Sequence, residues 1–402
     1  MVRQGPEEKG RRSSPAQPEP GRKVKSLSQA GHVFDGPTPV VSLDHAGLAF
    51  GRDAPGAEIA ELAALVARPP LVGRADLLGC RGSLKRGCDY AVAIPVRNEA
   101  RRLPAALAAL AAAMRAVPRS GCAVFVLNDT EDRSADIIEG WARREHVSAL
   151  IVEIAFAEPI RNAAHARRLA LDLAAKAAPE GLIFTSDADT TVGEAWIYRC
   201  FQSIAAGYDL VCEDVLLDED ELSALPARVR QVGEAERAYL ELCDLLWRYW
   251  TFGRAGGLAI RPSGASLAIR ASAYLAVGGL PVPSAGEDRA LYEVMAGSGS
   301  AVEALANIGT RTSARLTSRA AGGCGDALAD RAGSDDPFCD SRLKPVWLLH
   351  DEAMLWLEVH QRHNRGFFAV PRTCERMRFS AVEREMAIAR KLAAASGLID
   401  AA

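Results

Sequence analysis

A pair of aspartates separated by one residue follows a short apolar run in this sequence. Residues 181–184 form the run. Asp187 comes directly after Ser186, and Asp189 lies two residues further along the chain. In extended backbone, side chains two residues apart point to the same side. Two carboxylates on one side suit a hard divalent cation, Mg²⁺ or Mn²⁺, which takes further ligands from water and substrate phosphates. The alternative is a solvated acidic turn, because an isolated pair of this spacing is common.

A second pair of carboxylates, Glu287 and Asp288, follows a loop rich in proline and glycine and opens a predicted helix that runs to Met295. Carboxylates in the first turn of a helix interact favourably with the helix dipole. The catalytic alternative is a general base, which takes the proton from a hydroxyl that attacks a metal-bound substrate. Spacing alone leaves both roles open.

Asp129 and Arg167 are candidates for contacts with a nucleotide. Asp129 follows the apolar run 123–127 and could accept a hydrogen bond from a nucleobase imide or a ribose hydroxyl. Its alternative place is the N-cap region of a helix, which favours aspartate. Arg167 and Arg168 lie in a predicted helix over residues 163–177. Either could contact a diphosphate, but their spacing favours surface charge.

Arginines recur every four residues at Arg311, Arg315 and Arg319, among serines and threonines. On a helix they would share a face, and in a loop they could surround a phosphate or a carboxylate. A solvated face is the ordinary alternative. Two further groups are weaker candidates: His350, His360 and His363 could complete a metal site, and Trp247, Tyr249 and Trp250 could stack on a sugar.

The elements that must position these residues are strands and helices in alternation. Apolar runs at 91–96, 123–127, 149–154 and 181–184 alternate with helical patterns, the last of them at 163–177. This order predicts an α/β fold with a parallel sheet covered by helices on both faces. In such sheets ligands bind outside the carboxyl ends of the strands. The polar clusters that follow the strands, at 98–99, 128–129 and 187–189, are therefore predicted to converge on one site.

Six segments in this order resemble the family 2 glycosyltransferases with the GT-A fold. They are AIPVRNEA (93–100), VLNDTEDRSADII (126–138), AHARRLALDLA (164–174), FTSDADT (184–190), GASLAIRASAYLAVGGL (264–280) and GEDRALYEVM (286–295). The resemblance covers about residues 88–325. It implies a nucleotide-diphospho-sugar transferase fold, with a mostly parallel sheet flanked by helices and a helical C-terminal extension.

The resemblance also implies a role for each candidate residue. Pro95, Arg97 and Glu99 hold the nucleotide; Asp129 reads the base; Arg167 lies near the diphosphate; Asp187 and Asp189 hold the metal, with Asp189 as its direct ligand; Gly264 and Ser266 lie where donor sugar and acceptor meet; Glu287 belongs to the donor site; and Asp288 is the catalytic base. Attack by the acceptor hydroxyl would then invert the anomeric configuration. Asn128 replaces the first aspartate of the family's usual pair.

Composition limits the class of protein. The 402 residues carry 48 Lys and Arg against 51 Asp and Glu, a net charge of −3, so no overall basic surplus predicts nucleic-acid binding. The longest apolar run, 105–114, is too short to span a bilayer. Nine cysteines without a CxxC pair favour reduced thiols and a cytoplasmic location.

The expected organisation is a disordered basic arm over residues 1–38, an extension over 39–87 that packs on the core, a GT-A domain over 88–330, and the helical extension over 331–402. The expected partners are a UDP- or GDP-sugar and an unknown acceptor, with peripheral membrane contact through the arm as an option. The QxxRW signature of processive synthases is absent, which favours a single transfer. The alternatives are a noncatalytic nucleotide-sugar-binding protein and a sugar-nucleotide nucleotidyltransferase, although residues 96–100 lack the glycine-rich loop of the latter.

Overall fold

The computed structural model of this chain describes residues 56–69, 71–255, 257–258, 262–317, 322–363 and 374–400. The predicted disordered arm at 1–38 lies outside the described residues. The described part of the predicted extension over 39–87 contains α1 (Gly56–Val66) and β1 (Ala75–Gly82), and β1 is a strand of the main sheet. The predicted domain boundaries stay predictions.

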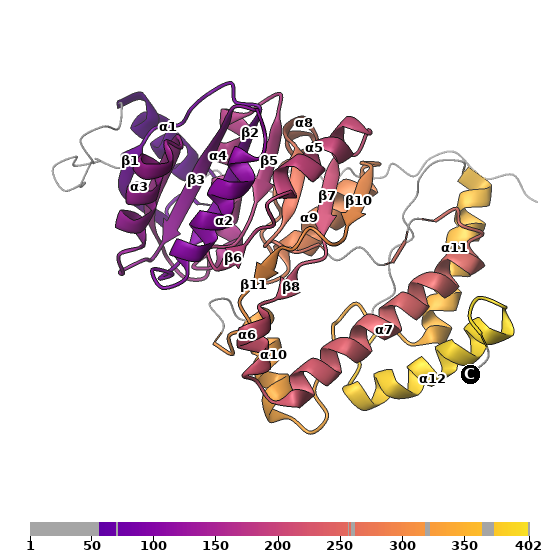
Figure 1. Ribbon diagram of the computed structural model, residues 1–402. Coiled ribbons are helices and arrows are strands. Elements are labelled where there is room, and N and C mark those ends of the chain that lie inside the picture. Colours follow the sequence, from indigo (N-terminus) through magenta and orange to yellow (C-terminus); the bar gives the residue numbers. More distant parts are fainter. Residues whose placement is uncertain are drawn as a thin grey trace, which may run out of the picture. The chain divides into compact units, whose positions relative to one another are not determined.

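The main sheet of the described residues has eight strands in the order β1-β4-β3-β2-β5-β9-β7-β10 (Figure 1). Its other members are β2 (Tyr90–Val96), β3 (Gly121–Asn128), β4 (Ala149–Phe156), β5 (Leu182–Thr185), β7 (Leu210–Glu213), β9 (Leu267–Arg270) and β10 (Val302–Leu305). The four apolar runs predicted as strands are β2 to β5, and they pair in parallel as expected. The predicted mostly parallel sheet is confirmed.

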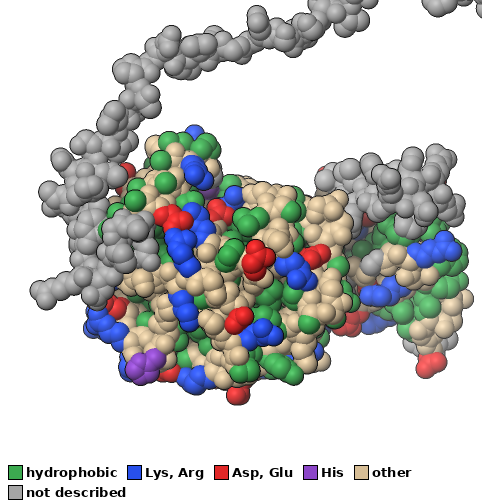
Figure 2. Space-filling model, turned by 90° about the horizontal axis from the view of Figure 1, so that it is seen from above, with side chains coloured by type: hydrophobic (Ala, Val, Ile, Leu, Met, Phe, Trp, Pro, Cys, Tyr) green, Lys and Arg blue, Asp and Glu red, His purple; other side chains and the backbone are tan. Residues whose placement is uncertain are grey.

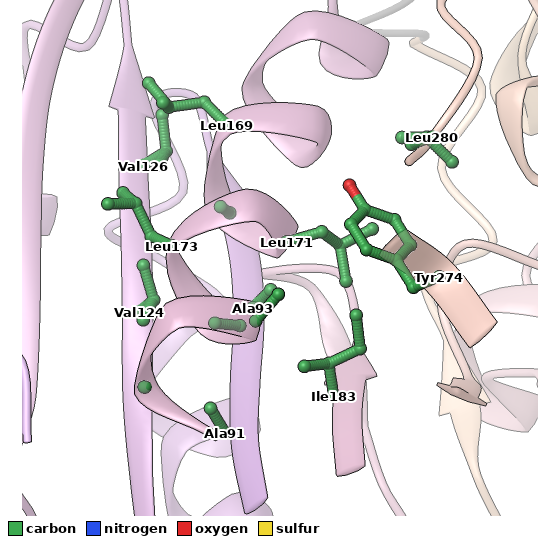
Figure 3. Packing of buried hydrophobic residues seen from close by; sticks show 14 of the residues in the cluster. Ala91, Ala93, Val124, Val126, Leu169, Leu171, Leu173, Ile183, Tyr274 and Leu280 are labelled. Atoms are coloured by element: carbon green, nitrogen blue, oxygen red, sulfur yellow. The ribbon is translucent and has the colours of Figure 1, made fainter. Parts of the chain in front are cut away.

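Helices cover both faces of this sheet because the residues of its central strands alternate in direction. Ala91 and Ala93 of β2 pack in one core with α4 (Ala163–Ala177), whereas Val92 and Ile94 pack in another, against the helices of the opposite face. Figure 3 shows the first core, where leucines of α4 lie over β2 and β3. The second core contains residues of α2 (Leu103–Arg115), α3 (Ser134–Glu145) and α5 (Trp196–Ala205).

The strand order creates a switch point between β2 and β5. From β2 the chain runs to β3 and β4 on one side, then returns through α4 to place β5 on the other side of β2. Connections that leave in opposite directions open a crevice at the carboxyl ends of the two strands. The polar residues that follow β2 and β5 are therefore brought to the same crevice.

A small second sheet attaches a distant segment to this crevice. It has the order β6-β11-β8, from β6 (Thr190–Thr191), β11 (Arg311–Thr312) and β8 (Leu216–Leu217). β6 begins directly after Asp189, and the hydroxyl groups of Thr190 and Thr312 are 2.9 Å apart. The chain after residue 312 is thus held beside the aspartate pair.

The expected pattern of strands is incomplete. The strands β1 and β9 run antiparallel to their neighbours and were not expected. In the second half of the chain, residues 218–250 contain two helices, α6 (Glu219–Ser223) and α7 (Ala227–Trp250). Pro226 precedes α7, and its missing N–H and restricted ring explain the break.

The predicted C-terminal helices are present. They are α10 (Cys324–Gly333), α11 (Val346–His363) and α12 (Phe379–Ala395), and α11 and α12 share a third core with α7. The shorter helices α8 (Ala271–Ala276) and α9 (Glu287–Gly297) follow β9. Within the described parts of the chain, no helix is both long and apolar enough to cross a bilayer. The face drawn in Figure 2 carries interspersed basic and acidic side chains.

A buried ion pair joins α10 to α7. Arg331 Nη2 donates to both carboxylate oxygens of Glu236, at 2.9 and 2.8 Å, and the Asp340 N–H donates to the same carboxylate at 2.8 Å. Only 13% of the Arg331 side chain and 9% of the Glu236 side chain are exposed. Burial raises the pKa of Glu236, and the Arg331 guanidinium opposes that shift because it stabilises the charged form of the carboxyl group.

We predict that Arg331→Met lowers the free energy of unfolding by about 3–5 kcal/mol, because it leaves a buried carboxylate without its cation. Urea denaturation followed by circular dichroism measures the change. The control is Arg230→Met, which breaks the exposed pair between α7 and Glu219, with 41% and 57% of the side chains exposed. That variant should change stability by about 0.5 kcal/mol or less. Equal effects of the two substitutions would contradict the prediction.

Candidate active site

A cavity of about 410 Å³ lies at the carboxyl ends of β2, β3 and β5. The first turns of α4, α9 and α10 and the segment after β11 complete its wall. Nine of the predicted site residues line it: Pro95, Arg97, Glu99, Arg167, Asp187, Asp189, Gly264, Glu287 and Asp288. The convergence expected from the strand pattern is therefore observed.

Arg167 lies at the centre of this arrangement. Its Nε donates to Glu287 at 3.1 Å, its Nη2 donates to Asp187 at 2.6 Å, and its Nη1 donates to Thr185 Oγ1 and to the Gly264 carbonyl, both at 2.8 Å. Only 4% of the side chain is exposed, so the interpretation of Arg167 as surface charge is wrong. Burial alone would lower the pKa of the guanidinium, but the charges of Asp187 and Glu287 outweigh it and raise that pKa.

Most of the donors of Arg167 are thus taken by protein groups. They connect α4, the end of β5, the loop before β9 and the start of α9. Gly264 has to be glycine at this point, because a Cβ there would lie 2.6 Å from Arg167 Nη2. The geometry assigns Arg167 to holding the site together, and its contact with a diphosphate stays a prediction.

The two aspartates of the pair differ in burial. Asp189 is 11% exposed, and its pKa is raised to about 6 by burial and by the negative charge of Asp187, with Arg315 opposing. Asp187 is 33% exposed and is oriented by Arg167. A carboxylate with a raised pKa gains most from a nearby cation, since the cation stabilises its charged form.

The donor set fits a divalent cation that is shared with a substrate. Five carboxylates and three guanidinium groups line the cavity, a formal surplus of two negative charges. The described residues contain no cluster of three or more His, Cys, Asp or Glu arranged to hold a metal. A divalent cation at Asp187 and Asp189 would need water and phosphate oxygens as further ligands, and its binding there stays a prediction. His350 packs on Trp250 and does not line the cavity, and the side chains of His360 and His363 are not described.

The position of Asp288 agrees with both roles that its spacing left open, and the role of general base stays a prediction. It lies in the first turn of α9, after the N-cap Gly286, and it lines the cavity. Its Oδ2 accepts the Gly264 N–H at 2.9 Å and its Oδ1 accepts the Arg289 N–H at 2.7 Å. Burial and the neighbouring Glu287 raise its pKa, which makes the carboxylate a stronger base than a solvated aspartate.

The three arginines of the 311–319 segment do not share a helix face. Arg311 belongs to β11 and donates to the Leu217 carbonyl at 3.4 Å, outside the cavity. Arg315 lies in the loop that follows, lines the cavity and pairs with Glu99 and Asp189. Arg319 lies outside the described residues.

Asp129 and Ser266 are two predicted site residues that the described cavity wall does not include. Asp129 pairs with Arg161 at 3.0 Å, while its Oδ2 is buried and has no hydrogen-bond partner among the described residues. It does not cap α3, which begins at Ser134. Ser266 is buried and donates to Glu213 at 2.7 Å. This hydrogen bond gives Ser266 a structural role. The roles of Asp129 and Ser266 in ligand binding stay predictions.

The predicted aromatic residues lie outside the cavity wall, and several residues of that wall were not predicted. Trp247, Tyr249 and Trp250 lie on α7 and, in the part of the chain that the structure describes, do not line the cavity. Wall residues that sequence reasoning missed include Asn162, Ser263, Thr312, Ser313 and Cys324. Asn162 carried a usable signal, because an asparagine before a helical pattern marks an N-cap, and its side chain does accept the His165 N–H.

The family model described as glycosyl transferase family 2 matches residues 91–265. This segment is a family 2 glycosyltransferase domain. The match runs from β2 to the loop before β9, so it includes Arg167 and the aspartate pair but ends before Asp288. It confirms the predicted glycosyltransferase class and, with the observed sheet, the predicted GT-A fold. A search of curated protein sequences finds no match.

Solved structures similar to this glycosyltransferase include three from different organisms. The mannosyltransferase PcManGT of Pyrobaculum calidifontis, in complex with GDP-Man and Mn²⁺, is 15% identical over 85% of this chain and 83% of its own, with a TM-score of 0.41. TarS 1–349 of S. aureus, in complex with UDP-GlcNAc, is 12% identical over 68% and 73%, with a TM-score of 0.42. Glucosyl-3-phosphoglycerate synthase of Mycobacterium tuberculosis, with Mn²⁺, UDP-Glc and phosphoglyceric acid, is 14% identical over 71% and 86%, with a TM-score of 0.34. These TM-scores are below 0.5, so the assignment rests on the family match.

We predict that Gly264→Ala disrupts the glycosyltransferase site, because its Cβ would lie 2.6 Å from Nη2 and 2.7 Å from Cζ of Arg167. Displacement of this guanidinium should lower stability by about 1–3 kcal/mol, the usual effect of overpacking. Thermal denaturation measures the change. Gly297→Ala on α9 is the control, since a Cβ there meets no atom within 4 Å. A Gly264→Ala protein as stable as the control would contradict the role given to Arg167.

Proposed function

We propose that this glycosyltransferase domain moves a sugar from a nucleoside-diphosphate donor to an acceptor hydroxyl, with a divalent cation and with inversion at the anomeric carbon. The observation that carries the proposal is that Asp288 and the pair Asp187 and Asp189 line one cavity, in which Arg167 pairs with Asp187 and with Glu287, the neighbour of Asp288. A base and a cation site in one cavity supply the two groups that such a transfer requires.

The donor would lie along the ends of β2 and β5. Pro95, Arg97 and Glu99 form the wall near β2 and are the residues proposed to hold the nucleotide. The proposed contact of Asp129 with the nucleobase rests on the family resemblance, since Asp129 follows β3 and does not line the cavity in the described part of the chain. Whether the nucleoside diphosphate of the donor is UDP or GDP stays a prediction. The cation, when bound at Asp187 and Asp189, would offset the charge of the departing diphosphate.

Asp288 would take the proton of the acceptor hydroxyl as its oxygen forms the new bond to the anomeric carbon. The bond from that carbon to the diphosphate oxygen breaks at the same time, and the nucleoside diphosphate leaves. The hydrogen bond from the Gly264 N–H holds the Asp288 carboxylate beside Gly264, where donor and acceptor are proposed to meet. Positioning of this kind supplies a large part of the rate enhancement in group transfer.

A single, non-processive transfer to an acceptor that is not a nucleic acid is the form of the reaction we propose. It is supported by the absence of the QxxRW signature in the sequence and by the balanced charge of the chain. None of the nine cysteines forms a disulfide in the described residues, which agrees with reduced thiols, and the cytoplasmic location stays a prediction. The acceptor and any contact with a membrane surface are not assigned.

We predict that one nucleoside diphosphate stabilises the protein only when Mn²⁺ or Mg²⁺ is present. A thermal-shift panel would test UDP, GDP, ADP and CDP, each with and without metal. A ligand at about 100 times its dissociation constant adds about 2.7 kcal/mol of stability. Asp189→Ala should abolish the shift, whereas Asp335→Ala, which removes an exposed aspartate outside the cavity, should preserve it. A panel with no shift would favour a different ligand class.

We predict that Asp288→Asn lowers turnover of the nucleotide-sugar that binds by a factor of about 10² or more, while nucleotide binding persists. Because the pKa of Asp288 is raised and the base must be ionised, kcat/KM of the wild type should fall as the pH decreases through that raised pKa. The variant should lack this acidic limb. Glu293→Gln is the control, since Glu293 lies on the same helix, is 55% exposed and pairs only with Arg289 among the described residues. Full turnover by Asp288→Asn would assign the base elsewhere.

A further inference from the structure

Arg315 bridges two carboxylates that come from different strand ends. Its guanidinium pairs with Glu99, which follows β2, and its Nη2 lies 3.0 Å from Oδ2 of Asp189, which follows β5. The side chains of Arg315, Glu99 and Asp189 are 18%, 6% and 11% exposed. Water therefore screens these charges weakly, and the bridge is a defined feature of the cavity.

A divalent cation and this bridge compete for the same carboxylate. Mg²⁺ and Mn²⁺ bind carboxylate oxygens directly, and Asp189 Oδ2 is already the acceptor of the guanidinium. A dication and a guanidinium within a few ångströms of each other also repel strongly in a partly buried site. Occupation of Asp189 by the metal therefore favours a conformation in which the guanidinium has moved away.

The side chain of Arg315 makes this movement, because hydrogen bonds hold the backbone before Arg315 in place. Glu221 accepts a hydrogen bond from Ser313 Oγ at 2.6 Å and another from the Ala314 N–H at 2.8 Å. The Arg315 N–H donates to Ser313 Oγ at 3.2 Å. Rotation about the side-chain torsions can carry the guanidinium over several ångströms while the backbone stays in place.

An anionic substrate offers the displaced guanidinium a new partner inside the same cavity. Arg315 lines the cavity together with the first turns of α4, α9 and α10, whose N–H groups also favour negative charge. A diphosphate presents oxygens that match the planar fork of an arginine. The guanidinium that the metal displaces from Asp189 can thus pair with the diphosphate of the nucleotide that the metal binds.

We propose that Arg315 occupies the cation position on Asp189 and Glu99 until the substrate arrives, and that its transfer to the diphosphate makes metal and nucleotide bind cooperatively. The inference rests on the proposed function, since it needs a metal at Asp189. By linkage, the factor by which the nucleotide tightens metal binding equals the factor by which the metal tightens nucleotide binding. Arg315 contributes part of that factor, and replacement of Arg315 removes this part.

The test is a titration of the full chain with Mn²⁺, followed by the electron paramagnetic resonance signal of the free ion. It is carried out at about pH 8, where carboxylates are ionised, without nucleotide and then with UDP or GDP. For Arg315→Ala we expect Mn²⁺ alone to bind about tenfold more tightly than to the wild type, because a neighbouring positive charge has been removed. The tightening by the nucleotide should shrink about fivefold or more.

Arg311→Ala is the matched control. It removes an arginine four residues away that donates to the Leu217 carbonyl and does not line the cavity, so Mn²⁺ affinity should stay at the wild-type value. Asp189→Asn defines the background. Arg315→Gln, which removes the charge and retains a hydrogen-bonding amide, should change Mn²⁺ binding in the same direction and serves if the alanine variant does not fold.

The outcomes separate this inference from the proposed function. Mn²⁺ binding that Asp189→Asn abolishes but Arg315→Ala leaves at wild-type strength overturns the inference alone. Mn²⁺ binding that Asp189→Asn leaves unchanged, or no binding by the wild type with or without nucleotide, overturns both the inference and the metal site of the proposed function.

Discussion

The burial of the Arg167 guanidinium is the constraint on which the rest of the site depends. A buried cation is tolerated only when anions and acceptors surround it, because desolvation otherwise costs several kcal/mol. Here the partners come from the end of β5, the loop before β9 and the start of α9. One side chain thereby fixes the relative positions of the aspartate proposed to bind metal and the helix that carries the proposed base. Loss of the arginine would leave two carboxylates uncompensated.

Much of the sheet could be predicted from local pattern. Runs such as Tyr90–Val96 are apolar on both faces, as a strand covered on both sides must be, and each ends in polar residues. The strands β1 and β9 carry weaker signals, since β1 contains Arg81 and two glycines, and β9 has only four residues. Their places are decided by pairing with distant strands, which no local window contains.

The site was likewise predictable only where a local pattern marks its residues. Asp187, Asp189 and Asp288 follow recognisable segments, and their places in the cavity agree with the strand order. The burial of Arg167 was not visible, because helical spacing does not show which face meets a loop from residue 264. Nor does spacing show that β6 and β11 pair, which is what carries Arg315 to Asp189 and leaves Arg311 outside. Side-chain direction at a strand end depends on such tertiary pairing.

The helix α10 has a consequence for the transmission of force. Its first turn forms part of the cavity wall, and its last turn is fastened to α7 by Arg331 and Glu236. Ten residues of helix make a stiff rod about 15 Å long. A load applied to the C-terminal helices can therefore be transmitted to the cavity wall along α10, and a ligand in the cavity can transmit force to those helices along the same path.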